Sequence, residues 1–148
     1  MKKIFLFIAL VSLTFTINSC SHQDDNNSKG VITFKVDGVQ KTLNKIIVNE
    51  QKYLEGTANE YTQIVINASN KNSADWMIFS VKKGNLEDTI DDFIYATDLD
   101  TGHDRTDNFA FHIITNGEDR KITGTFSGDM TNGAGTISIS EGSFNIQY

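Results

Sequence analysis

The chain has 148 residues and a formal net charge of −6, with 19 acidic and 13 basic side chains. This acidic balance argues against nucleic acid as a partner, because binding to phosphates needs clustered Lys and Arg side chains. The single cysteine excludes a disulfide within the chain, so the folded part must be stabilised by its hydrophobic core.

Residues 1–19 have the pattern of a signal peptide. Lys2 and Lys3 give a positive start, and residues 4–17 form an uncharged, mostly apolar run. A helix of that length would extend about 21 Å, which is short of the roughly 30 Å hydrocarbon core of a bilayer. The run is therefore predicted to be the hydrophobic region of a signal peptide and not a stable membrane span.

Cys20 follows Ser19 directly at the end of this segment. A small residue before a cysteine at this place resembles a bacterial lipobox, although Ile17 stands where a standard lipobox favours Leu. The resemblance implies cleavage between Ser19 and Cys20, a diacylglyceryl group on the thiol, and a palmitate-type chain on the new amino group. Two or three such chains would anchor the protein stably, at about 0.8 kcal/mol per buried CH₂. The alternative is ordinary secretion with a free thiol.

Residues 20–29 contain no apolar side chain after Cys20, so they are predicted to be a flexible tether between lipid and domain. Four of them resemble the acidic export signal of Bacteroidota-type lipoproteins: Ser21, Gln23, Asp24 and Asp25. This resemblance implies an outer-membrane lipoprotein that faces the cell exterior. A periplasm-facing anchor is the alternative.

Residues 30–148 are predicted to form a single all-β domain. Residues 31–36 alternate apolar and polar side chains, and Asp37 and Gly38 follow as the central pair of a tight hairpin turn. Closing the hairpin there pairs Phe34 with Lys41, which makes Lys41 the one charged side chain on an otherwise apolar face.

The rest of the domain is expected to add short strands with turn signals between them. About nine to eleven such strands are typical of an antiparallel β-sandwich, and a closed, lipocalin-like β-barrel is the alternative. One turn of helix after Asn85 is an option in a stretch that is difficult to interpret. The further strands are predicted at 46–48, 53–58, 61–68, 76–81, 93–97, 109–115, 121–128, 136–140 and 143–147.

Two parts of the domain resemble small uncharacterised Bacteroidota-type surface lipoproteins. Residues 34–38 are similar to their first strand and turn, and residues 123–128 with 137–146 are similar to their closing hairpin. The resemblance covers about a third of the domain. It implies a lipid-anchored, all-β protein and supplies no catalytic residue.

Asp98, Asp100 and Asp104 carry carboxylates at spacings that suit a calcium loop, since Ca²⁺ takes six to eight oxygen ligands. The EF-hand pattern is broken, because His103 occupies the place of its glycine and Phe109 that of its last glutamate. The prediction is therefore a solvated acidic loop, with Ca²⁺ as the alternative and no other cofactor.

Four aromatic residues are candidates for stacking on sugar rings if they share an exposed face: Trp76, Tyr53, Tyr61 and Tyr95. Packing in or at the rim of the core is the alternative for Trp76. The chain shows no paired-His metal motif, nucleophile elbow or phosphate-binding glycine loop, so no enzyme is predicted.

The expected function is a non-catalytic binding module for an extracellular glycan or peptide. One alternative is a structural or interaction protein that docks on another envelope protein. The other is a small hydrolase or inhibitor, since the spacing of two carboxylates in space is not visible in the sequence.

Overall fold

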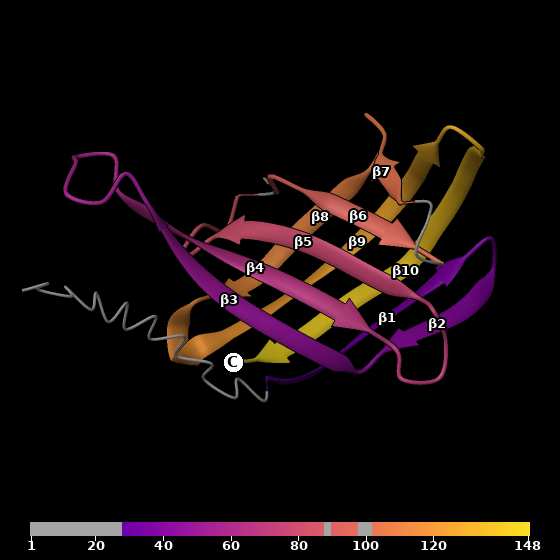
Figure 1. The fold of residues 1–148 in the computed structure, drawn as a ribbon, viewed down its shortest axis with the longest axis horizontal. Helices are drawn as coiled ribbons and strands as arrows, with labels where there is room; N and C mark the ends of the chain where they lie inside the picture. Colours follow the sequence, from indigo (N-terminus) through magenta and orange to yellow (C-terminus); the bar gives the residue numbers. More distant parts are fainter. Residues whose placement is uncertain (1–27, 88–89, 98–101) are drawn as a thin grey trace, which may run out of the picture.

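A computed structural model describes residues 28–87, 90–97 and 102–148, and these fold into one antiparallel sheet (Figure 1). The predicted signal peptide, Cys20 and most of the predicted tether lie outside the described residues. A short 3₁₀ turn, η1, covers Glu118–Arg120. The ten strands are β1 (Lys29–Val36), β2 (Val39–Leu43), β3 (Lys45–Tyr53), β4 (Tyr61–Ser69), β5 (Trp76–Lys82), β6 (Phe93–Ala96), β7 (His103–Arg105), β8 (Ala110–Asn116), β9 (Lys121–Asn132) and β10 (Gly135–Gln147).

The sheet curls until its two ends meet. Its strand order is β2-β1-β10-β9-β7-β6-β5-β4-β3, and β8 pairs with β9 beside this path. Only Asn44 separates β2, which pairs with β1, from β3, which pairs with β4. A bridge between Ser28 and Ile46 then brings the start of β1 beside β3. The sheet is therefore nearly closed.

The prediction of an antiparallel all-β domain with nine to eleven strands is confirmed. The strands form one continuous, barrel-like sheet, which is the arrangement that the barrel alternative describes. In Figure 1, β3, β4 and β5 cross in front of β8, β9 and β10, so the curled sheet is also flattened into two facing layers. This explains why the sequence pattern of a sandwich and that of a barrel are both present.

Aromatic rings fill the space between these layers. Phe79 lies 5.3 Å from Phe144 between ring centroids, and Phe93 lies 5.2 Å from Phe126. These four side chains come from β5, β10, β6 and β9, and none is more than 3% exposed. Aromatic side chains bury large apolar areas, so this cluster contributes strongly to stability together with the buried aliphatic side chains around it.

The first hairpin has the predicted register. Phe34 pairs with Lys41, Ile32 with Leu43 and Val36 with Val39. Asp37 and Gly38 both have positive φ angles, of 48° and 82°, as the turn requires. β1 starts at Lys29, one residue before the predicted domain boundary, because Lys29 pairs with Gln147 of β10.

Several local predictions are wrong. The strand predicted at 53–58 does not form, because the backbone turns after Tyr53 with positive φ at Leu54 and Gly56. The two strands predicted at 136–140 and 143–147 are one strand, β10, which passes through a bulge at Glu141 with φ of 52°.

Two further predictions also need correction. The turn between the strands predicted at 121–128 and 136–140 is shorter than those ranges imply, since β9 continues to Asn132. The stretch between the strands predicted at 93–97 and 109–115, which includes the predicted acidic loop, contains β7, which the chain forms by pairing with β6 and β9. Asn85 does not begin a helical turn within 85–87. Its side chain accepts a hydrogen bond from the Glu87 N–H at 2.9 Å, which closes a local turn. Among the described residues, no helix has the length and apolar character needed to span a membrane.

Candidate functional site

Most of the residues predicted to anchor or export the protein cannot be placed. Ser19, Cys20, Ser21, Gln23, Asp24 and Asp25 lie outside the described residues, and so do Asp98 and Asp100 of the predicted acidic loop. Asp104 is described, and it is an exposed residue of β7 whose backbone pairs with Ile94 and Thr131. In the described part of the chain, no three His, Cys, Asp or Glu side chains gather as a metal site would require.

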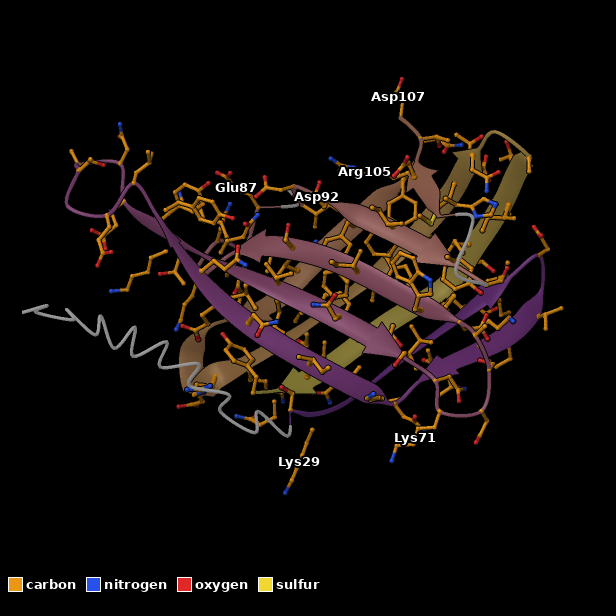
Figure 2. All side chains as sticks on the ribbon, viewed as in Figure 1. Lys29, Lys71, Glu87, Asp92, Arg105 and Asp107 are labelled. Carbon is orange, nitrogen blue, oxygen red and sulfur yellow. The ribbon has the colours of Figure 1, made fainter. Side chains whose placement is uncertain are left out.

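The charged residues along β5 to β7 project outward. Figure 2 shows Glu87 and Asp92 at the margin of β5, and Arg105 and Asp107 at and just after β7. Asp91 has a structural contact, because its carboxylate accepts a hydrogen bond from Gln63 at 2.7 Å. Glu87, Asp92, Arg105 and Asp107 are therefore exposed charges of both signs along this margin of the sheet.

The four aromatic candidates do not share one face. Tyr95 is fully buried, so its predicted role in stacking on a ligand is wrong. Trp76 pairs with Ser69, which lies eight residues beyond Tyr61 on β4. At about 3.3 Å per residue, this separates Trp76 from Tyr61 by roughly 26 Å along the strand.

Only Tyr53 and Tyr61 come together. They are cross-strand neighbours on β3 and β4, and their rings stack at 5.2 Å with an angle of 10° between planes. The Lys82 ammonium lies 5.1 Å from the centroid of the Tyr61 ring. Tyr61 therefore has neighbours of its own chain, and Tyr53, with 38% exposure, is the ring of the pair that solvent reaches more.

Lys41 is a charged residue on an otherwise apolar face, and its counter-ion there is Asp75. The Lys41 ammonium lies 3.0 Å from the Asp75 carboxylate, which also accepts hydrogen bonds from Tyr95 at 2.7 Å and Ser73 at 2.6 Å. Burial raises the pKa of Asp75, but these three hydrogen bonds and the charge of Lys41 outweigh it, so the net shift is downward. Burial and the bond to Asp75 raise the pKa of Tyr95 far above its ordinary value, which keeps its hydroxyl a donor.

A hollow of about 320 Å³ opens on the outside of the sheet, beside the ends of β5 and β8 and the start of β9. We call this the β8 hollow. Two of its wall residues are among the large exposed apolar side chains of the described chain, Leu86 at 56% and Ile114 at 55%. Its lining residues are Gly84, Leu86, Ile114, Thr115, Asn116, Asp119 and Lys121.

Asn116 joins the two sides of the β8 hollow. Its side-chain N–H groups donate to the carbonyls of Lys82 at 2.8 Å and Asn85 at 2.7 Å, which fixes β8 against the turn after β5. The residue is 6% exposed, and its Oδ1 is buried without a hydrogen-bond partner. An unpaired buried acceptor costs about 1 to 3 kcal/mol, so this oxygen is unusual.

Two opposite charges lie in the same lining. Neither the Asp119 carboxylate nor the Lys121 ammonium forms an ion pair with a described side chain. Asp119 sits in the η1 turn with φ of 53°, and its carbonyl accepts a hydrogen bond from Gln147 at 2.6 Å. The Tyr148 N–H donates to the Arg120 carbonyl at 2.9 Å, so the C-terminal residues hold this turn in place.

The β8 hollow lies at the end of the sheet where the described chain begins. Lys121 pairs with Gln147, and Gln147 pairs with Lys29 on its other side. Neighbouring strands lie about 4.8 Å apart, so Lys29 is two strand spacings, roughly 10 Å, from Lys121. The predicted tether would therefore leave the domain close to this hollow.

Comparisons with protein-family models, with curated proteins and with solved structures found no match to this chain. Sequence reasoning did not find the β8 hollow, because Leu86, Ile114 and Lys121 are ordinary residue types whose meeting depends on strand pairing. The one local signal is the dipeptide Asn116-Gly117, which indicates a turn and not a pocket.

Proposed function

We propose that this protein is a lipid-anchored outer-membrane protein that faces the cell exterior, and that its domain is a non-catalytic binding module for an extracellular glycan or peptide. The anchor is Cys20, and residues 21–27 are the tether, because Ser28 already bridges to Ile46 and β1 begins at Lys29. The β8 hollow supports the binding role. It combines apolar walls with two charged groups, Asp119 and Lys121, that form no ion pair within the described chain. Such a combination is typical of small ligand sites.

Binding on the outside of the sheet agrees with the packing of the interior, which aromatic rings fill. A lipocalin-like barrel holds its ligand in the interior that its strands enclose. Here that space contains packed rings such as Phe34, Phe93 and Phe126, with Phe34 5.8 Å from Phe126 between centroids. A ligand therefore meets the domain at its surface, and the β8 hollow is a surface feature with a suitable lining.

The second candidate is an interaction protein that docks through a strand edge. β8 pairs with β9 on one side, and in the described residues no strand pairs with its other side. β8 carries no Lys, Glu, Asp or Pro, which are the residues that usually protect such an edge. An extended peptide of an envelope protein would add to β8 as a further strand.

Replacing Cys20 by serine should abolish the anchor, because a hydroxyl does not replace the thiol in lipidation. Intact mass of the wild-type protein extracted in detergent should equal residues 20–148 plus acyl chains, and whole cells should lose it to added protease. The Cys20→Ser chain should carry no acyl mass. An unacylated wild-type protein that is released without detergent would contradict the anchor.

The β8 hollow is tested with glycan and peptide arrays probed with the full-length protein in detergent. Ile114→Asp should remove binding to the ligand found, because it places a charge in an apolar wall. Val39→Asp is the matched control, since Val39 is also exposed, at 62%, but lies on the first hairpin. Equal binding by the two variants would show that the ligand site is elsewhere.

A further inference from the structure

The polar groups of the β8 hollow form a set of complementary charges. Lys121 offers a cation and Asp119 offers an anion, and neither forms an ion pair with a described side chain. Leu86 and Ile114 add an apolar surface to the same lining. A ligand that satisfies all of them must carry a negative group, a positive group with N–H donors, and an apolar group within a small volume.

We propose that the β8 hollow binds a free amino acid with an apolar side chain, or a dipeptide of the same character. The ligand carboxylate pairs with the Lys121 ammonium. The ligand ammonium pairs with the Asp119 carboxylate, and its apolar side chain packs on Leu86 and Ile114. This inference rests on the proposed function, and it narrows the ligand from a glycan or peptide to a small zwitterion.

The volume supports this choice of ligand. At about 320 Å³, the hollow is at the lower end of the range of roughly 300 to 1,000 Å³ that small-molecule sites occupy. An amino acid or a dipeptide fits such a space, whereas a long glycan chain would extend beyond it. A glycan also carries no ammonium and carboxylate pair by necessity, so the opposite charges of Asp119 and Lys121 would have no use.

The walls are held before any ligand arrives. Asn116 is fixed by its two bonds to Lys82 and Asn85, and the turn that carries Asp119 is fixed by Gln147. A site that is already ordered loses less entropy on binding, which favours affinity for a small ligand. Ordered walls also favour selection between ligands that differ by one charged group.

The test is calorimetric titration of the full-length protein in detergent with L-leucine and three relatives. N-acetyl-leucine lacks the positive charge, leucinamide lacks the negative charge, and glycine lacks the apolar side chain. Leucine should bind, and the affinity of each relative should be lower by at least about tenfold. Each relative loses either a charge-assisted hydrogen bond or the apolar contact.

Two variants assign the charges. Lys121→Gln should weaken leucine binding about tenfold. It should leave leucinamide binding unchanged, because leucinamide has no carboxylate that pairs with Lys121. Asp119→Asn should weaken leucine and leave N-acetyl-leucine unchanged. Asn tolerates the left-handed backbone of residue 119, so the turn is kept. Lys45→Gln, an exposed change on β3, is the control and should change nothing.

The outcomes separate this inference from the proposed function. No binding of leucine, or binding that Lys121→Gln and Asp119→Asn leave unchanged, would overturn the amino-acid ligand. If the arrays then identify a glycan or a longer peptide whose binding Ile114→Asp removes, the proposed binding module stands and only its ligand class changes. If Ile114→Asp removes nothing, the β8 hollow is not the site.

Discussion

Replacing Gly142 by alanine is expected to destabilise the fold by about 3 kcal/mol, because the added methyl group has no space. Gly142 lies on β10 opposite Phe126 of β9. A Cβ there would overlap the Phe126 carbonyl and would lie 2.5 Å from Cδ2 and 2.7 Å from Cε2 of its ring. The ring can rotate, but the carbonyl belongs to the backbone of the sheet, so the two strands would have to separate.

Gly124 should behave in the same way. It lies on β9 opposite Phe144 of β10, so the two strands carry a reciprocal pair of contacts in which each glycine faces a phenylalanine. A Cβ at Gly124 would overlap the His112 carbonyl and the Phe144 ring. Small residues opposite rings allow β8, β9 and β10 to approach closely and the sheet to curl.

Urea unfolding of the purified variants measures the effect, and Gly133→Ala is the matched control. A Cβ at Gly133 has no atom within 4 Å, so that variant should differ from the wild type by less than about 0.5 kcal/mol. Equal midpoints for Gly142→Ala, Gly124→Ala and Gly133→Ala would contradict the close packing of β9 and β10. Lower midpoints with unchanged slopes for the first two would support it.

The first hairpin is the part of the fold that the sequence predicts in most detail. Asp37-Gly38 defines the turn, and the period of two then determines every pair of β1 and β2. The same reasoning marks Lys41 as an exception on the inner face. It does not identify Asp75 as the partner, because the two residues are 34 positions apart and meet only when β2 lies near the start of β5.

The middle of the domain is where prediction from sequence fails. β7 has three residues and forms because β6 and β9 flank it, so no local pattern marks it. The bulge at Glu141 joins two stretches that were predicted as separate strands, since a turn and a bulge both use a residue with positive φ. Local sequence therefore gives the strand content more reliably than the strand boundaries.

The candidate site depends still more on long-range pairing. Leu86 follows the turn after β5, whereas Lys121 begins β9, and the two share the β8 hollow because Asn116 bonds to Lys82 and Asn85. The role of Tyr95 shows the same limit. An aromatic residue in a strand has the same local pattern whether its ring faces ligand or core, and the bond to Asp75 decides between them.

Replacing Asp75 by alanine is expected to cost about 3 kcal/mol of stability at neutral pH. The change leaves the Tyr95 hydroxyl, which is fully buried, without its acceptor and removes the counter-ion of Lys41. Lys41 has 26% of its side chain exposed, so water compensates part of the loss and the cost stays near the lower end of the range for buried pairs. Asp107→Asn, an exposed change, is the control.

The effect of Asp75 should also depend on pH. Its folded-state pKa is lowered from the model-peptide value of 3.8, so between the two pKa values the unfolded chain binds the proton more readily than the folded chain. The stabilising contribution is therefore complete above a pH of about 4 and is lost as the pH falls through the lowered pKa.

Urea unfolding at a series of pH values checks the sign of this dependence. The difference in unfolding free energy between the wild type and Asp75→Asn should be constant from pH 7 down to a pH of about 4 and should shrink below it. A difference that grows on acidification would mean that the carboxylate is harder to ionise in the folded protein. That result would contradict the ion pair with Lys41 and the hydrogen bonds from Tyr95 and Ser73 as the dominant influences on Asp75.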